Sequence, residues 1–235
     1  MSWNESTQME GGATEYSFSL TVGDHQVPGV YWAPAGGGDR LVLLGHGGTT
    51  HKKVEYIVEV AQMLVAKGIA AMAIDGPGHG DRVTDRWEHE PQRFGEMWEA
   101  GGGTDTMLGD WQAALDFVEA EHGARPTGWW GLSMGTMMGL PVTARESRIR
   151  VALLGLMGTW GPNADDLQAL APQVKCPVRF LVQWDDEVVP RESCLTLFGL
   201  LGSERKTLHA NPGLHAAVPS FEVAQSVAYL DEHLR

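Results

Sequence analysis

The 235-residue sequence predicts an α/β fold in which helices cover both faces of a mostly parallel central sheet. Segments that are apolar throughout alternate along the chain with segments whose apolar residues recur at helical spacing. Strands that are apolar on both faces are typical of parallel sheets, because helices cover both sides of such sheets. The length favours a single domain over residues 15–235, preceded by a flexible N-terminus over residues 1–14.

The first half of the chain begins with two strands and then alternates. Residues 15–23 and 25–34 are strand-like and flank Gly23-Asp24, a two-residue turn signal, so we expect a hairpin. The next expected elements are a strand at 40–45, a helix at 54–68, a strand at 69–75, a glycine-rich turn at 76–82, a polar and aromatic excursion through residue 106, and a helix at 108–123 with Asp110 as its cap.

The second half repeats a strand followed by a helix. The expected elements are a strand at 126–133, a helix at 134–145, a strand at 148–158, one short helix within 159–175, a strand at 176–186, a helix at 191–202, a strand at 205–210 and a closing helix at 220–234. Ligands of parallel sheets bind outside the carboxyl ends of the strands, so we expect a site in the loops that follow them.

The composition argues against several classes of partner. The formal net charge of −13 and the sequence pI near 5.0 disfavour a nucleic-acid-binding surface and binding to anionic membranes. No apolar run approaches the length of a membrane-spanning helix, and residues 1–12 lack the apolar core of a signal peptide. Cys176 and Cys194 have no metal-ligand spacing and are expected to be reduced, so we expect a cytoplasmic protein with no metal or other cofactor.

A candidate nucleophile lies in the sequence GLSMG, residues 131–135. Ser133 stands between two glycines at the junction of an expected strand and an expected helix. The pentapeptide alone is a weak signal in a glycine-rich chain, and an ordinary loop serine is the alternative. A serine nucleophile also needs a base that takes its proton and a carboxylate that orients the base. WDDEVVP (184–190) and NPGLH (211–215) follow the next strands and supply both residue types.

On these motifs the chain resembles the α/β-hydrolase superfamily, in particular its small cap-poor branch of dienelactone hydrolases and bacterial carboxylesterases. The resemblance covers about residues 15–235 and includes GHGG, DGPGHGD, GLSMG, DDEVVP and NPGLH. It implies a sheet of about eight strands with a minimal cap. It also implies a catalytic triad of Ser133 as nucleophile, His215 as base and Asp186 as the orienting acid.

Two positions of this triad have alternatives. The family's aspartate stands four residues before the proline of a D-x-x-V-P pattern, which selects Asp186, but register alone separates it from Asp185. His215 follows a proline-glycine pair, as the family's histidine does. The other candidate base, His209, lies in a strand-like run, where a packed or hydrogen-bonded histidine is the ordinary expectation.

The resemblance further implies an oxyanion hole made by two backbone N–H groups. One belongs to Met134, the residue after the nucleophile, and the other to the His46-Gly47-Gly48 loop. Gly48 is the better candidate in that loop; Gly47 is second, and we also expect it to contact the substrate. We expect His46 itself to be structural.

The function implied is hydrolysis of carboxylic esters, with short to medium acyl chains, through an acyl-enzyme on Ser133. A small-molecule ester is the expected partner. Thioester, lactone, amide and carbon–carbon bond hydrolysis are alternatives on the same triad. Dienelactone hydrolases carry a cysteine nucleophile, so the serine here favours simple esters. A hydrolase-fold receptor that binds ligand with slow or no turnover is the rival class.

The long interval at 82–106 suggests a place where specificity could lie. Phe94, Met97 and Trp98 have helical spacing, so one face can present all three. This face either forms a pocket wall or packs on the core, and the sequence leaves both open. Trp160 is a further candidate substrate-binding residue.

Overall fold

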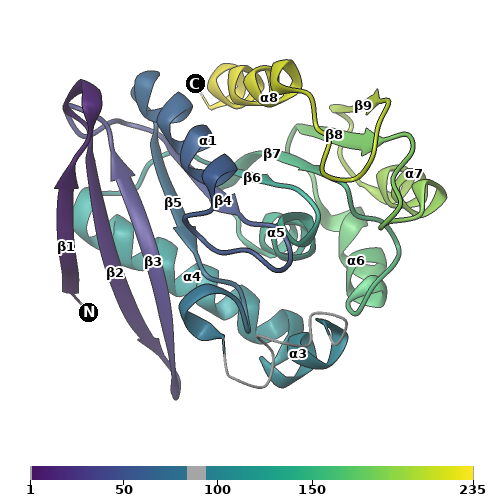
Figure 1. Ribbon diagram of the computed structural model, residues 1–235, viewed down its shortest axis with the longest axis horizontal. Coiled ribbons are helices and arrows are strands. Elements are labelled where there is room, and N and C mark those ends of the chain that lie inside the picture. Colours follow the sequence, from purple (N-terminus) through teal and green to yellow (C-terminus); the bar gives the residue numbers. More distant parts are fainter. Residues whose placement is uncertain (1, 84–93, 235) are drawn as a thin grey trace.

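The computed structural model describes residues 2–83 and 94–234. Within these residues one nine-stranded sheet runs through the molecule in the order β1-β2-β3-β5-β4-β6-β7-β8-β9 (Figure 1). Its strands are β1 Ser2–Gln8, β2 Thr14–Val22, β3 His25–Ala33, β4 Leu41–Gly45, β5 Ala70–Ile74, β6 Thr127–Gly131, β7 Ile149–Gly155, β8 Val178–Gln183 and β9 Lys206–Asn211.

The sheet is antiparallel at one end and parallel over the rest. β1, β2, β3 and β5 pair antiparallel with one another in that order, whereas β5, β4, β6, β7, β8 and β9 all run parallel. Gly23-Asp24 joins β2 to β3, with Val22 paired to His25, as the predicted hairpin requires. The expected α/β fold with a mostly parallel sheet is confirmed.

The ninth strand comes from the N-terminus. The expectation that residues 1–14 are flexible does not agree with the structure, in which β1 pairs antiparallel with β2. Trp3 gives the physical reason, because its ring centroid lies 4.8 Å from that of Phe117, 5.3 Å from Tyr16 and 5.7 Å from Tyr31. Packing of this one large aromatic side chain favours a docked strand over a free end.

Helices cover both faces of the sheet (Figure 1). α1 and α8 pack over one face, and α4, α5, α6 and α7 pack over the other. Their bounds are α1 Glu55–Ala66, α3 Phe94–Ala100, α4 Gly103–His122, α5 Met134–Arg145, α6 Ala164–Leu170, α7 Arg191–Leu200 and α8 Ser220–His233, with 3-10 turns at Glu10–Gly12, Gly80–Arg82 and Ala171–Gln173.

The helix that follows Ser133 is buried almost all round. α5 has the predicted bounds, and its residues from Met134 to Thr143 are all buried. Its glycines let it approach the sheet closely: a Cβ atom on Gly139 would lie 1.9 Å from Nε1 of Trp129, so the indole of Trp129 occupies that space. An apolar helix with no polar face is expected at the centre of a packed layer.

α4 begins at Gly103, five residues before the predicted start, after Gly102 in the left-handed region with φ 87°. Asp110 therefore lies inside the helix and is not its cap. Its carboxylate is 1% exposed and pairs with Nη1 of Arg82 and Nε2 of His25, each at 2.7 Å. The apolar pattern does not predict this longer helix, because the buried ion pair places a charged residue on its apolar side.

Among the described residues, the connections between elements leave little room for a cap. The interval between β7 and β8 holds only α6 and one 3-10 turn, as expected. Part of the other long interval, 84–93, lies outside the described residues, and so does the tryptophan at position 87. None of the described helices is both long and apolar enough to cross a membrane.

Candidate active site

Ser133 lies at a sharp turn between β6 and α5. Its backbone has φ 57° and ψ −121°, in a region that residues other than glycine seldom adopt. A Cβ atom on Gly131 would lie 2.6 Å from the Gly135 carbonyl oxygen, and one on Gly135 would lie 2.3 Å from the Gly45 carbonyl oxygen. The Ser133 N–H donates to the Gly155 carbonyl oxygen at 3.0 Å. The two glycines therefore permit the close packing that holds Ser133 at the carboxyl end of β6.

His215 lies between Ser133 and Asp186. Its Nε2 is 3.0 Å from the Ser133 Oγ, and its Nδ1 is 2.7 Å from Oδ2 of Asp186. An ionised carboxylate only accepts hydrogen bonds, so Nδ1 carries the proton of the neutral ring and Nε2 accepts the Ser133 hydroxyl proton. The structure thus brings together the three residues that the sequence selected for this chain of hydrogen bonds.

The carboxylate of Asp186 is fixed by the backbone. Its side chain is 1% exposed. Its Oδ1 accepts the N–H groups of Val188 and Val189, each at 2.8 Å, which leaves Oδ2 facing His215. A buried carboxylate that accepts several hydrogen bonds stays in one orientation, so the imidazole is held in one tautomer.

The residues on either side of Asp186 hold the backbone of the loop that carries His215. Oδ2 of Asp185 accepts the Gly213 N–H at 3.1 Å, and Oε2 of Glu187 accepts the His215 N–H at 2.8 Å. Asp185 therefore contacts the loop backbone and Asp186 the imidazole. The sequence reasoning missed Glu187, whose signal was only its place in an acidic run.

The other candidate base, His209, lies on β9 and takes part in a different cluster. Its Nδ1 is 3.8 Å from the carboxylate of Glu222, the residue that also accepts a hydrogen bond from Nε of Arg179 at 3.0 Å. Arg179 and Glu222 are both buried. This pair ties the start of α8 to β8, so His209 belongs to the packing of α8.

The loop after β4 presents two glycine N–H groups that differ in their partners. The Gly47 N–H donates to the hydroxyl of Tyr56 at 2.6 Å. Within residues 2–83 and 94–234, the N–H groups of Gly48 and Met134 donate to no protein acceptor. The ring of Phe94 packs near this loop, because a Cβ atom on Gly48 would lie 3.7 Å from it. Gly48 and Met134 therefore have donors available for a ligand.

His46 is fully buried and holds two loops together. Its Nε2 accepts the Gly76 N–H at 2.9 Å, so its Nδ1 carries the proton and donates to the Gly47 carbonyl oxygen at 2.8 Å. Burial, together with the neighbouring His79, lowers the pKa of His46 to about 3. The neutral ring therefore links the loop after β4 to the loop after β5, which is the kind of structural role expected for His46.

A buried aspartate anchors the same two loops. Asp75 is fully buried after β5; its Oδ1 accepts the Lys52 N–H at 2.8 Å, and its Oδ2 accepts the Lys52 ammonium at 2.7 Å and the Asp81 N–H at 2.9 Å. The Lys52 ammonium also lies 2.6 Å from the exposed carboxylate of Asp81. Burial acts to lower the pKa of Lys52, but its hydrogen bonds to the two aspartates outweigh burial, so the pKa is raised.

A cavity of about 410 Å³ opens beside Ser133 and is also lined by His215, Gly47 and Gly48. Its volume lies in the ordinary range for sites that take small molecules. Neither Trp98 nor Trp160 lines this cavity, which therefore gives no support to the prediction that they bind substrate. Trp98 is 1% exposed and packs in the core, whereas Trp160 is 43% exposed. Of the helical face formed by residues 94–98, Trp98 therefore packs in the core, where its large indole joins the cluster of buried apolar side chains.

No group of three or more metal-ligating side chains occurs in the part of the chain that the structure describes. The arrangement at Ser133 supplies a hydroxyl, a neutral imidazole that accepts its proton, a buried carboxylate and two open N–H donors. Together these groups are suited to acyl transfer.

The chain is similar to a known hydrolase family and to solved esterase structures. The family model described as "Serine aminopeptidase, S33" matches residues 38–161. No curated protein matches the sequence. Among solved structures, the PEG-bound form of a cold-adapted esterase from an Arctic intertidal metagenomic library is 61% identical, with a TM-score of 0.94 and full coverage of both chains.

More distant structures share the fold. A dienelactone hydrolase from Anabaena variabilis is 22% identical, with a TM-score of 0.73, and the match covers 95% of this chain and 99% of that one. An esterase from Pyrococcus furiosus is 14% identical, with a TM-score of 0.73, and the match covers 94% and 93%. The family match contains the Ser133 elbow and the Gly47-Gly48 loop, and the 61% identical esterase extends the likeness through His215 to the C-terminus. The chain therefore belongs to the α/β-hydrolase superfamily, in the family described as serine aminopeptidase, S33.

Proposed function

We propose that this protein hydrolyses carboxylic esters of small molecules through an acyl-enzyme formed on Ser133. The observation that carries the proposal is the unbroken chain of hydrogen bonds from the Ser133 hydroxyl through His215 to Asp186, beside a cavity that Ser133 and His215 line. The 61% identical relative is an esterase, which supports the same activity here.

The reaction follows from the positions of the protons. His215 Nε2 takes the Ser133 proton as Oγ attacks the ester carbonyl carbon, and the imidazolium then gives that proton to the departing alkoxide. Water repeats the sequence on the acyl-enzyme and releases the acid. Asp186 keeps Nδ1 protonated and stabilises the positive charge that His215 carries in each transition state.

The developing oxyanion needs donors that are in place before the reaction. We assign this part to the N–H groups of Met134 and Gly48, because neither donates to an acceptor among residues 2–83 and 94–234. Gly47 is less suitable, since its N–H already donates to Tyr56. Each such donor is worth about 3–4 kcal/mol of transition-state stabilisation.

We also propose a cytoplasmic location. Cys176 and Cys194 are the only cysteines of the chain, and both are free. Burial raises the pKa of each thiol to about 12, so neither is a reactive thiolate at neutral pH. Free, unreactive cysteines are what a reducing compartment permits.

The test is turnover of 4-nitrophenyl esters from acetate to palmitate by the wild type and by Ser133→Ala. We expect a burst of nitrophenol in the wild type and a loss of kcat by a factor of about 10⁴ in the variant. Asp186→Asn should be severely impaired, whereas its matched neighbour Asp185→Asn should lose little, because Asp185 contacts only loop backbone. Saturable binding without turnover would favour a receptor, and an active Ser133→Ala variant would place the nucleophile elsewhere.

A further inference from the structure

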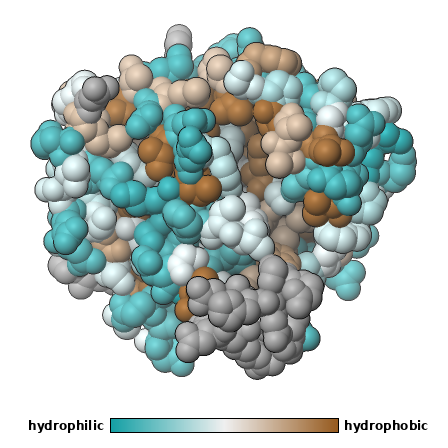
Figure 2. Space-filling view, in the orientation of Figure 1, coloured by the Kyte–Doolittle hydropathy of each residue, from teal (hydrophilic) through white to brown (hydrophobic). Residues whose placement is uncertain are grey.

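The cavity at Ser133 extends between two helices. A face of α1, formed by Tyr56, Val60 and Met63, lines it, and so do Val218, just before α8, and Val223 of α8. Figure 2 shows hydrophobic residues gathered around a hollow in the upper middle of this face, where Figure 1 places α1 and α8. The groove is therefore suited to an apolar part of a substrate.

One charged side chain interrupts the apolar lining. Glu59 of α1 lines the cavity one turn from Tyr56 and Met63, and its side chain is exposed. No lysine or arginine lines this cavity in the described part of the chain. Across residues 2–83 and 94–234, Glu59 also makes no ion pair. Its charge therefore faces the groove without a compensating cation.

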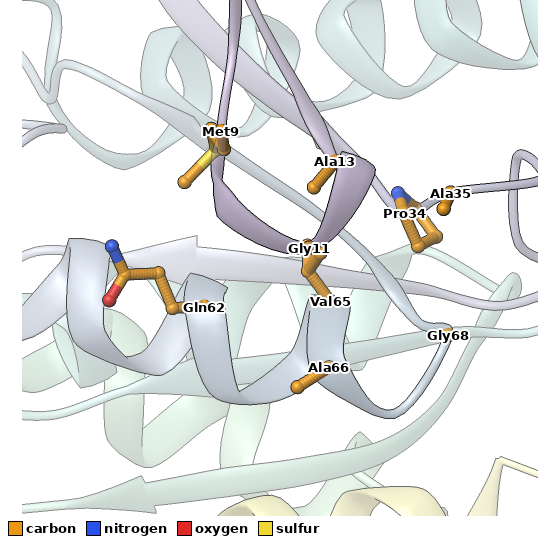
Figure 3. A pocket seen from close by; sticks show the side chains of 9 residues that line it. All are labelled: Met9, Gly11, Ala13, Pro34, Ala35, Gln62, Val65, Ala66 and Gly68. Carbon is orange, nitrogen blue, oxygen red and sulfur yellow. The ribbon is translucent and has the colours of Figure 1, made fainter.

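A neighbouring face of α1 lines a different cavity. Figure 3 shows Gln62, Val65 and Ala66 facing a second cavity, of about 490 Å³, below the N-terminal hairpin. Glu55 also lies on α1 but lines neither cavity. The helix thus offers residues of the same type and exposure that do not face Ser133, which makes matched controls available.

We infer that the groove between α1 and α8 takes an uncharged, largely aliphatic arm of the ester, and that Glu59 determines this preference by repelling an arm that carries a carboxylate. The inference rests on the proposed function. A negative charge at the same wall raises the free energy of an anionic substrate in the groove, and leaves a neutral one of equal length unaffected. Glu59 is in this sense a specificity-determining residue.

The experiment compares neutral and anionic esters of equal length. One pair varies the acyl arm, 4-nitrophenyl hexanoate and the 4-nitrophenyl monoester of adipic acid. The other pair varies the alcohol arm, 4-carbamoylphenyl butyrate and 4-carboxyphenyl butyrate. For each variant, kcat/KM for the anionic ester is divided by kcat/KM for the neutral ester. Comparing this ratio between variants cancels the intrinsic reactivities of the two esters. In at least one pair, Glu59→Gln should raise the ratio about fivefold. Glu55→Gln makes the same change in net charge and should alter it by less than about 1.5-fold.

Salt and steric changes supply independent readouts. In 0.5 M NaCl the ratio of the wild type should approach that of Glu59→Gln, because salt screens exposed charges. Met63→Trp should lower kcat/KM for long neutral esters relative to acetate by about fivefold or more. Its neighbour Gln62→Trp faces the second cavity and should leave this preference unchanged.

The results separate this inference from the proposed function. Neutral esters that are turned over by the wild type but not by Ser133→Ala establish the function whatever Glu59 does. The inference is overturned if Glu59→Gln leaves both ratios within twofold of the wild type, or if Glu55→Gln changes them equally. A wild type that hydrolyses no neutral ester would instead remove the proposed function, and the inference with it.

Discussion

Lys52 binds one buried and one exposed carboxylate at nearly equal distances, so a buried and an exposed ion pair can be compared at the same lysine. Its ammonium lies 2.7 Å from Asp75 and 2.6 Å from Asp81, whose side chains are 0% and 74% exposed. Asp75→Asn and Asp81→Asn each remove one carboxylate from the same lysine and keep the side-chain volume. If distance decided the outcome, the two variants would be equally destabilised.

We expect them to differ by several kilocalories per mole. Asp75 also accepts two backbone N–H groups, and an asparagine there must turn its NH₂ toward at least one of these donors. Removing one partner of a buried pair costs about 3–5 kcal/mol, whereas an exposed pair contributes about 0–1 kcal/mol. In a chain of this length the first loss corresponds to a fall in Tm of roughly 6–20 °C.

Urea unfolding followed by tryptophan fluorescence measures both variants against the wild type. Turnover at a temperature where all three are folded should also fall for Asp75→Asn, because Lys52 belongs to the connection that begins with the Gly47-Gly48 loop. Equal free energies of unfolding for the two variants, within 1 kcal/mol on the same scale, would refute the reasoning from burial.

Three further predictions test the elbow, the histidine loop and the buried histidine. Gly135→Ala should lower the free energy of unfolding in urea by about 2–3 kcal/mol, because its Cβ atom would lie 2.3 Å from a carbonyl oxygen. The control Gly109→Ala has open space around it inside α4 and should be neutral or stabilised. Equal losses in the two variants would contradict the packing argument. Glu187→Ala should lower kcat by about threefold to tenfold, with KM little changed. Glu187→Gln should retain the wild-type kcat, because an amide oxygen also accepts the His215 N–H. A low kcat in Glu187→Gln would mean that the carboxylate has a role other than accepting this hydrogen bond. Burial lowers the folded-state pKa of His46 to about 3 from an unfolded value of about 6.5, so the folded state binds fewer protons between these values. Its stabilising contribution is full above pH 6.5 and is lost as the pH falls toward 3. The free energy of unfolding, measured between pH 7.5 and 4.5, should fall with pH, and it should fall less in His46→Gln. Equal slopes of this free energy against pH in the two proteins would mean that His46 is not the group that titrates.

The sequence predicts well those features that local pattern alone decides. The bounds of α5 follow from the Ser133 turn on one side and from the next apolar strand on the other. The choice of Asp186 over Asp185 is a matter of register before Pro190, and in the structure the two carboxylates indeed turn toward different partners. Both are short-range properties of the chain.

Features decided by tertiary packing could not be predicted. Trp98 has the same helical spacing whether its face meets substrate or core, and only its 1% exposure distinguishes the two. Gly47 and Gly48 are chemically identical, and the difference between them arises from the hydroxyl of Tyr56, nine residues further along. Asp110 breaks an apolar pattern because its partners come from distant parts of the chain.

The last four strands of the sheet are arranged in the order of synthesis. β6, β7, β8 and β9 lie side by side in the sheet as they do in the chain, and β9 is the outermost strand. Ser133 leaves the ribosome 82 residues before His215, which arrives with the last strand and helix. Because chains fold from the N-terminus as they are made, a nascent chain can hold its nucleophile while it still lacks a base. Turnover should therefore appear only after the residues of β9 and α8 have left the ribosome.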